Sequence, residues 1–120
     1  MADNEHKGLQ RLLNAARFSW LGIKAAYRHE EAFRQEVLLL IVAIPLALYL
    51  GGGGLEKALL ISSVLLILIV EILNSAIEAV VDRFGGEIHE LSGRAKDMGS
   101  AAVSLAILNA AIIWAFIIIF

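Results

Sequence analysis

The hydrophobic residues of this chain gather into three long stretches, and polar residues are concentrated before and between them. A helix that crosses a membrane needs about 20 mostly apolar residues. The pattern therefore predicts membrane-spanning helices over residues 32–50, 55–81 and 98–120, with a loop over 82–97. Pro45 lies inside the first stretch, where a membrane helix tolerates proline if neighbouring groups bond the freed carbonyl.

The segment before the first span has a different periodicity. Apolar residues recur there at the spacing of one helical face, and Arg, Lys, Asn and Gln occupy the other faces. This pattern over residues 5–30 is typical of an amphipathic helix that lies in the membrane interface, with Trp20 as an anchor. The alternative is a helix packed against the protein's own spans, and the two arrangements are compatible with each other.

The composition agrees with a membrane protein. Of the 120 residues, 59% are hydrophobic and 18% are charged, whereas ordinary soluble domains have about 25% charged residues. A soluble domain of this length has too much surface to bury so much apolar material. The net charge of −2 provides no basic field for a nucleic acid, and the lack of cysteine excludes a disulfide scaffold and a thiolate metal site. We therefore expect an all-α integral membrane protein.

The basic residues predict how the spans are oriented. Every Lys and Arg except Lys57 lies before the apolar run that begins at Val37 or between the second span and the third. Basic segments stay on the cytoplasmic side, so this distribution predicts a cytoplasmic N-terminus and a cytoplasmic 82–97 loop. The glycine run at 51–54 is then a tight turn on the opposite side. The alternative is a phosphate-binding loop, but the run lacks the following Lys-Ser/Thr and lies on the wrong side of the membrane.

Polar residues interrupt the second span in a regular order. They recur at intervals of three and four residues, which places them on one stripe of a helix. The members of this polar stripe are Glu71, Asn74, Glu78 and Asp82. A carboxylate at the centre of a membrane helix costs at least about 2.5 kcal/mol, so such groups usually face a partner or a site. The stripe therefore predicts a functional site; the alternative is a hydrogen-bond network that holds an oligomer together.

The rise of the helix assigns different chemistry to the two glutamates of the stripe. Glu71 and Glu78 are separated by about 10 Å along the axis, so they cannot share one magnesium ion, whose ligands lie about 2.0–2.1 Å away. Glu71 occupies the deeper and drier position, which suits a general base. Glu78 suits a metal ligand whose shell is completed by another acid or by phosphate oxygens. Arg94 and Lys96 in the following loop supply cations for a polyphosphate.

Three longer motifs carry a resemblance to a known family. The sequence has no Walker A motif, protein-kinase glycine loop or GxSxG elbow, so an enzymatic site has to be built from helix faces and a loop. The motifs are EILNSAIEAVVD at 71–82, HELSGRAKDMGSAAV at 89–103 and EAFRQE at 31–36. Together with the order of the spans, they resemble the prokaryotic integral-membrane diacylglycerol kinases. The resemblance covers essentially the whole chain, although residues 38–57 and the last span are similar only in character.

The resemblance implies a homotrimeric enzyme of the bacterial inner membrane whose subunits share a cytoplasmic active site. Such an enzyme transfers the γ-phosphate of MgATP to the hydroxyl of diacylglycerol and forms phosphatidic acid. By position, Glu71 is implied to accept the proton, with Asn74 beside it. Glu30 and Glu78 are implied to bind Mg²⁺. The implied ATP contacts are Arg11, Phe18, Glu30, Glu78, Glu87, His89, Lys96 and Asp97. The implied lipid-site residues are Trp20, Ala32, Phe33, Arg34, Gln35, Glu36, Glu71 and Ser100. Phe18 stands where a relative has tyrosine, so it offers no hydroxyl.

Three other functions agree with parts of the pattern. An undecaprenol kinase of the same family would share the core motif, but the EAFRQE stretch and Trp20 favour diacylglycerol as the substrate. A small proton or ion channel could use a ring of Glu71 and Asn74, but it has no use for Lys96 and Asp97 beside a second acidic cluster. A scaffold protein is the last alternative, and a glutamate inside a span argues against it.

Overall fold

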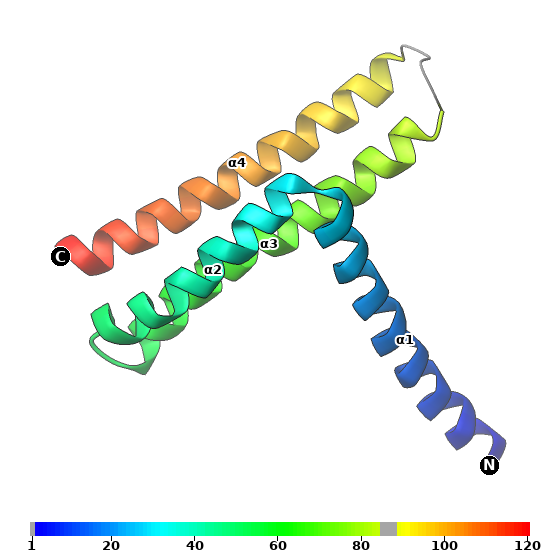
Figure 1. Ribbon diagram of the computed structural model, residues 1–120, viewed down its shortest axis with the longest axis horizontal. Coiled ribbons are helices and arrows are strands. Elements are labelled where there is room, and N and C mark those ends of the chain that lie inside the picture. Colours follow the sequence, from blue (N-terminus) through cyan, green and yellow to red (C-terminus); the bar gives the residue numbers. More distant parts are fainter. Residues whose placement is uncertain (1, 85–88) are drawn as a thin grey trace.

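The described residues form four helices, of which three are long and apolar enough to cross a membrane, as predicted (Figure 1). The computed structural model describes the backbone of residues 2–84 and 89–120, and the side chains of residues 7–84 and 89–120. The helices are α1 (Ala2–His29), α2 (Glu31–Leu50), α3 (Gly54–Asp82) and α4 (Glu90–Ile119). The three apolar helices are α2, α3 and α4.

Helix α3 is the centre of the bundle. It packs along most of α4 on one side and along α2 on the other, whereas α1 touches the bundle only near its C-terminal end and then projects away from it (Figure 1). The glycine run forms the turn between α2 and α3, where the Gly52 amide donates to Glu56 Oε2 at 2.8 Å. A side chain at Gly51 would meet the carbonyl oxygen of Ala47 at 2.9 Å and the Lys57 side chain, so this turn requires glycine.

The bend between α1 and α2 occurs at one residue, Glu30. Its backbone is extended, with φ −114° and ψ 110°, so the helix is interrupted there. Arg34 stabilises the bend, because its Nη1 donates to the carbonyl oxygens of Tyr27 at 2.9 Å and Arg28 at 3.1 Å. These carbonyls belong to the last turn of α1 and have no partner within the helix. The interaction fixes α1 to the start of α2.

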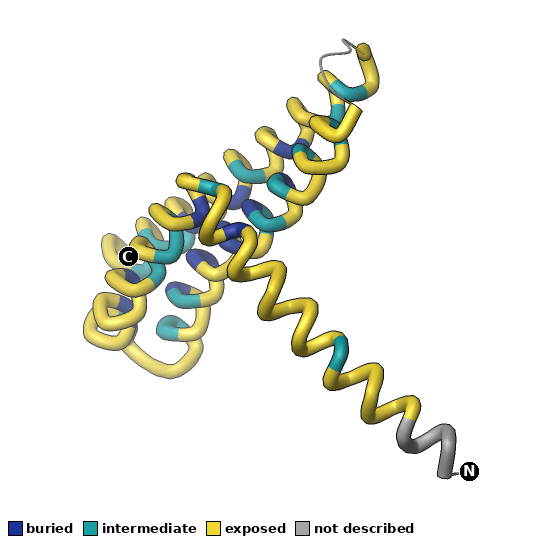
Figure 2. Tube along the Cα trace, turned by 45° about the vertical axis from the view of Figure 1, so that its right-hand side comes forward, coloured by how far each residue is buried: buried dark blue, intermediate teal, exposed yellow. Residues whose placement is uncertain are grey.

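The interior of the bundle is made of small and apolar side chains. Buried residues are confined to the lines along which the helices meet, and most of the outer surface is exposed (Figure 2). One cluster joins α1, α2 and α3 through Ala26, Phe33, Ala43, Val64 and Leu68. A second joins α3 to α4 through Ile67, Ala106 and Ala110. Small residues let membrane helices approach closely, because without a hydrophobic driving force between them their association depends on packing.

One side chain packs against both clusters and also forms hydrogen bonds across the bundle. Trp114 packs against both, and its Nε1 donates to the Leu60 carbonyl oxygen and to Ser63 Oγ, each at 3.2 Å. The Ser63 hydroxyl in turn donates to the Leu60 carbonyl oxygen at 2.8 Å. The polar atoms at this level of the bundle are therefore satisfied by one another.

The last helix begins earlier than the hydropathy pattern predicts. We predicted a loop over 82–97, but α4 starts at Glu90, so the second half of that segment is helical. His89 caps the helix, because its Nδ1 accepts from the Leu91 amide at 3.1 Å, and Arg94 forms an exposed pair with Glu90 at 3.6 Å. Hydropathy locates the apolar layer, whereas these local interactions determine where the helix begins.

Candidate functional site

The polar stripe of α3 continues the face by which this helix packs in the bundle. The buried residues of α3 follow one another at helical spacing from Leu60 to Leu68, all on the side that meets α2 and α4. Glu71 and Asn74 extend this series, with only 6% and 8% of their surface exposed. Glu78 is half-buried and Asp82 is exposed. The stripe therefore runs from the interior of the bundle to its surface.

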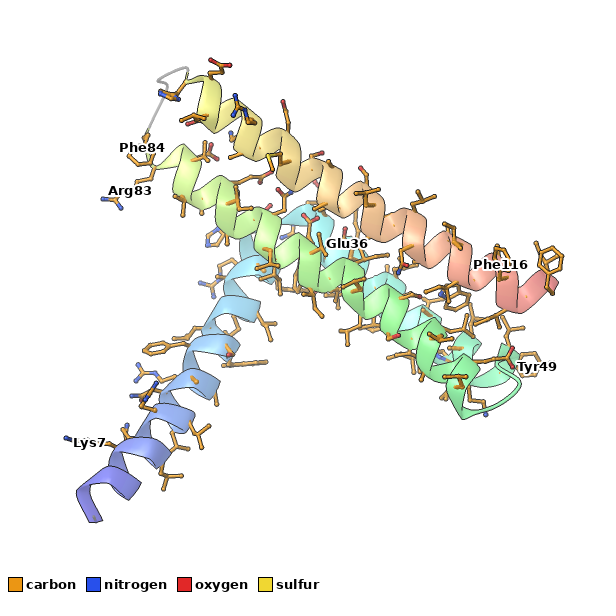
Figure 3. All side chains as sticks on the ribbon, turned by 180° about the vertical axis from the view of Figure 1, so that it is seen from behind. Lys7, Glu36, Tyr49, Arg83, Phe84 and Phe116 are labelled. Atoms are coloured by element: carbon orange, nitrogen blue, oxygen red, sulfur yellow. The ribbon has the colours of Figure 1, made fainter. Side chains whose placement is uncertain are left out.

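Three other carboxylates lie near enough to Glu71 for their charges to interact with it. The charges of Glu30, at the bend before α2, and of Glu78 both act on it, and the charge of Glu71 acts on Glu36 of α2. Figure 3 shows Glu36 at the level where α2 lies behind α3 and α4. In the described part of the chain, none of these four carboxylates forms a salt bridge. We call Glu30, Glu36, Glu71 and Glu78 the acidic cluster.

Several buried polar atoms around the acidic cluster have no hydrogen-bond partner among the described residues. They are Glu36 Oε2, Asn74 Oδ1 and Ser75 Oγ. A buried polar group without a partner is costly, and such groups are uncommon in native structures. Their concentration around an unpaired set of carboxylates is typical of a site that binds a ligand rather than of a structural network.

A pair of opposite charges lies at the outer end of the stripe. Lys96 Nζ, on the polar first turns of α4, donates to Asp82 Oδ1 at 2.6 Å. The hydrogen bond to Asp82, together with its charge, raises the pKa of the Lys96 ammonium above its usual value. The negative charge of Glu78 acts in the same direction. The site therefore has a positive group at its exposed end, next to the acidic cluster.

A cavity of about 350 Å³ opens beside the acidic cluster, between the end of α1 and α3. Glu30, His29 and Ser75 contribute polar groups to its wall, and the rest of the lining is glycine, alanine and Ile72. The sequence reasoning missed His29 and Ser75. Ser75 directly follows Asn74 in the polar motif, which is a signal for it, whereas His29 becomes relevant only through the bend at Glu30.

The structure separates two groups of predicted site residues. Arg11, Phe18 and Trp20 lie on the exposed length of α1, which projects away from the stripe (Figure 1). His89, Asp97 and Ser100 lie exposed on or just before α4, and the predicted ATP contact Glu87 lies outside the described residues. A single chain thus brings the acidic cluster, Asn74 and Lys96 together, but not the α1 residues.

The predicted lipid-site segment before the first span has mixed surroundings. Phe33 is 3% exposed and packs in the interior cluster, and Arg34 bonds the end of α1. Ala32 and Gln35 are exposed, and Glu36 belongs to the acidic cluster. Phe33 and Arg34 in this segment therefore stabilise the fold, whereas Glu36 belongs to the site.

For magnesium, the chemistry of the donor set is favourable. Carboxylate oxygens are the ligands that Mg²⁺ prefers, and the acidic cluster has no salt bridge among the described residues to compensate it. Over the same residues, no group of three or more His, Asp or Glu side chains is arranged to hold a metal ion. Mg²⁺ is commonly held by one or two carboxylates together with phosphate oxygens and waters, so Glu30 and Glu78 fit an ion that arrives with a nucleotide.

Comparisons with known proteins agree on one family. Residues 17–118 match the family described as prokaryotic diacylglycerol kinase. The chain is 55% identical over 115 residues to the diacylglycerol kinase of Escherichia coli (strain K12), covering 96% of this chain and 94% of the relative. It is 54% identical to that of Pseudomonas aeruginosa, covering 93% and 91%, and 44% identical to that of Helicobacter pylori (strain 26695), covering 90% and 84%. The similarity thus includes the stripe, the bend and α4.

Proposed function

This chain belongs to the prokaryotic diacylglycerol kinase family of phosphotransferases, and from that premise we propose that it transfers the γ-phosphate of MgATP to the hydroxyl of diacylglycerol, giving phosphatidic acid. The observation that carries the proposal is the buried Glu71 at the centre of an acidic cluster that has no salt bridge among the described residues. Membership of a kinase family argues against the alternatives of an ion channel and a scaffold protein.

Glu71 is the proposed general base. Its carboxylate lies inside the helix bundle, where few water molecules compete for the proton of a lipid hydroxyl. It takes that proton as the hydroxyl oxygen attacks the γ-phosphorus, and the bond from this phosphorus to the bridging oxygen of ADP breaks. Proton transfer by a positioned side chain contributes about 10²–10⁴-fold to the rate of such a reaction. Burial among α2, α3 and α4 supports this role.

Glu30 and Glu78 are the proposed ligands of Mg²⁺. The charges of both carboxylates act on Glu71, one from the bend before α2 and the other from α3, which supports a shared location. Glu30 and Glu78 would hold the ion when it binds with the nucleotide, and the ion would supply positive charge to offset the negative charge that develops during transfer. Lys96 and Asp97 belong to the nucleotide end of the site, where the ammonium of Lys96 is held by Asp82.

A complete site requires more than one copy of the chain. The positions of Arg11, Phe18 and Trp20 support a second copy, because α1 carries these residues away from the stripe of its own chain. We assign the protein to the bacterial inner membrane as a homotrimer, with α1 on the cytoplasmic surface, where it supplies these residues to a neighbour. The exposed apolar side chains of α1, among them Leu9 and Leu12, support burial against lipid or a neighbouring chain.

A phosphoryl-transfer assay tests the proposed function. The full chain in mixed micelles receives labelled ATP, magnesium and either diacylglycerol, undecaprenol or no lipid. We expect labelled phosphatidic acid with diacylglycerol and little product with undecaprenol. Preferential labelling of undecaprenol would change the substrate while keeping the family. No labelled lipid with either substrate would overturn the proposal.

A further inference from the structure

Helix α4 lies close against the polar stripe of α3 at Gly99. This glycine is buried, and a Cβ atom at its position would collide with Asn74 Oδ1 and lie 3.1 Å from Asn74 Cγ. Ala106 and Ala110, which are also buried on α4, face the side chains of the apolar cluster and accommodate a Cβ there. Position 99 is therefore a notch that receives the carboxamide of Asn74.

The notch determines which end of the carboxamide is available. Asn74 is more than nine-tenths buried, and its Oδ1, directed at Gly99, has no hydrogen-bond partner among the described residues. The oxygen and nitrogen of a planar carboxamide point away from each other, so an oxygen seated against α4 directs the Nδ2 donors away from α4. Glu71 and Glu78 lie one turn to either side of Asn74 on the same stripe.

We propose that Gly99 is a positioning residue of the kinase site, which seats the Asn74 carboxamide so that its Nδ2 donates to an oxygen of the transferring phosphoryl group. This rests on the proposed function, because it assumes that the reaction takes place between Glu71 and Glu78. Hydrogen-bond donors fixed toward developing negative charge stabilise the transition state more than the ground state. Gly99 itself touches no reacting atom and acts through Asn74.

A matched pair of glycine substitutions tests this role. Gly99→Ala and Gly93→Ala make the same chemical change in the same helix, but a Cβ at Gly93 meets nothing within 4 Å. We expect Gly99→Ala to lower kcat at least about tenfold, since losing one preorganised donor costs about 10²–10³-fold. The KM for ATP and the magnesium midpoint should change less than about twofold. Gly93→Ala should match the parent chain.

The second arm separates positioning from simple helix spacing. In an Asn74→Ala background the carboxamide is absent, so adding Gly99→Ala should change the residual kcat less than about twofold. An equal loss in both backgrounds would mean that Gly99 only sets the distance between the helices, and an unchanged kcat in Gly99→Ala alone would overturn the proposal. If Gly99→Ala does not assemble, the double variant should assemble again while staying at the kcat of Asn74→Ala; a double variant that also fails to assemble would overturn it.

The same experiment distinguishes failure of the inference from failure of the proposed function. If the parent chain phosphorylates diacylglycerol while Gly99→Ala retains full kcat, only the role of Gly99 is wrong. If the parent chain labels no lipid under the same conditions, the kinase assignment itself is wrong, and the notch then has no reaction to serve.

Discussion

The two halves of α3 both contain buried polar groups but treat them differently. In the apolar half, residues 54–68, the Ser63 hydroxyl and the Trp114 indole bond to each other and to a carbonyl oxygen. In the polar half, residues 71–82, Asn74 Oδ1 is buried without a hydrogen-bond partner among the described residues, and the buried Glu71 forms no salt bridge with any of them. Satisfied polar groups stabilise a helix pair, whereas unsatisfied ones are retained where a ligand completes them. One helix thus contains both the satisfied hydrogen bonds that stabilise the bundle and the candidate site.

The largest expected effect separates catalysis from stability in the polar half. Glu71→Gln keeps the size of the side chain and removes the proposed base, so kcat should fall by about 10²–10⁴-fold with little change in the KM for ATP. The thermal stability of this variant in detergent should not fall, because the substitution removes a buried charge. Steady-state assays and thermal scans measure the two quantities. Glu90→Gln, on the exposed start of α4, is the control.

The next prediction separates the roles of the carboxylates within the acidic cluster. Glu30→Gln and Glu78→Gln should each raise the magnesium concentration needed for half activity by about 10–100-fold, which is the range for disturbing a metal's surroundings. Glu71→Gln should leave this midpoint unchanged, because a base acts on the transferring proton. Magnesium titrations at fixed ATP measure all three variants. Equal shifts in all three, or a shift in Glu71→Gln alone, would show that the roles are wrongly divided.

A third prediction asks whether the polar half is completed by another chain. An Arg11→Gln chain keeps its stripe, and a Glu71→Gln chain keeps its α1. Random mixing of the two should restore about a quarter of the parent activity, since about one neighbouring pair in four then joins an intact stripe to an intact α1. Activity is assayed after co-refolding the two chains with distinguishable tags. Mixed oligomers with no gain over either variant alone would argue for a site within one chain.

The smallest effect concerns the apolar half. Trp114→Phe removes the indole donor but keeps an aromatic ring between the two clusters, so unfolding free energy should fall by about 0.6 kcal/mol, the average for hydrogen bonds between membrane helices. Because this level of the bundle is remote from the acidic cluster, kcat should stay within about twofold. Equilibrium unfolding in mixed detergents measures the loss. A large drop in kcat would contradict this division, because it would show that the apolar half of α3 also contributes to catalysis.

The sequence predicted the spans and the polar stripe because both depend on periodicity along one helix. Hydropathy is sufficient to locate α2, α3 and α4, and helical spacing places Glu71 and Asn74 on one face. It could not predict that Glu36 approaches Glu71, or that Gly99 faces Asn74, because these contacts depend on how two helices are aligned. The predicted start of α4 was wrong for another reason, because capping interactions outside the apolar stretch determine where this helix begins.

The bend at Glu30 has a mechanical consequence. A single extended residue joins α1 to α2, and that residue is also a proposed metal ligand. The 28 residues of α1 form a rod about 42 Å long that ends next to this residue. A rotation of about 5° would move the far end of the rod by about 4 Å while Glu30 hardly shifts. A spectroscopic label near Lys7 would therefore report a small change of angle at Glu30 as a displacement of several ångströms.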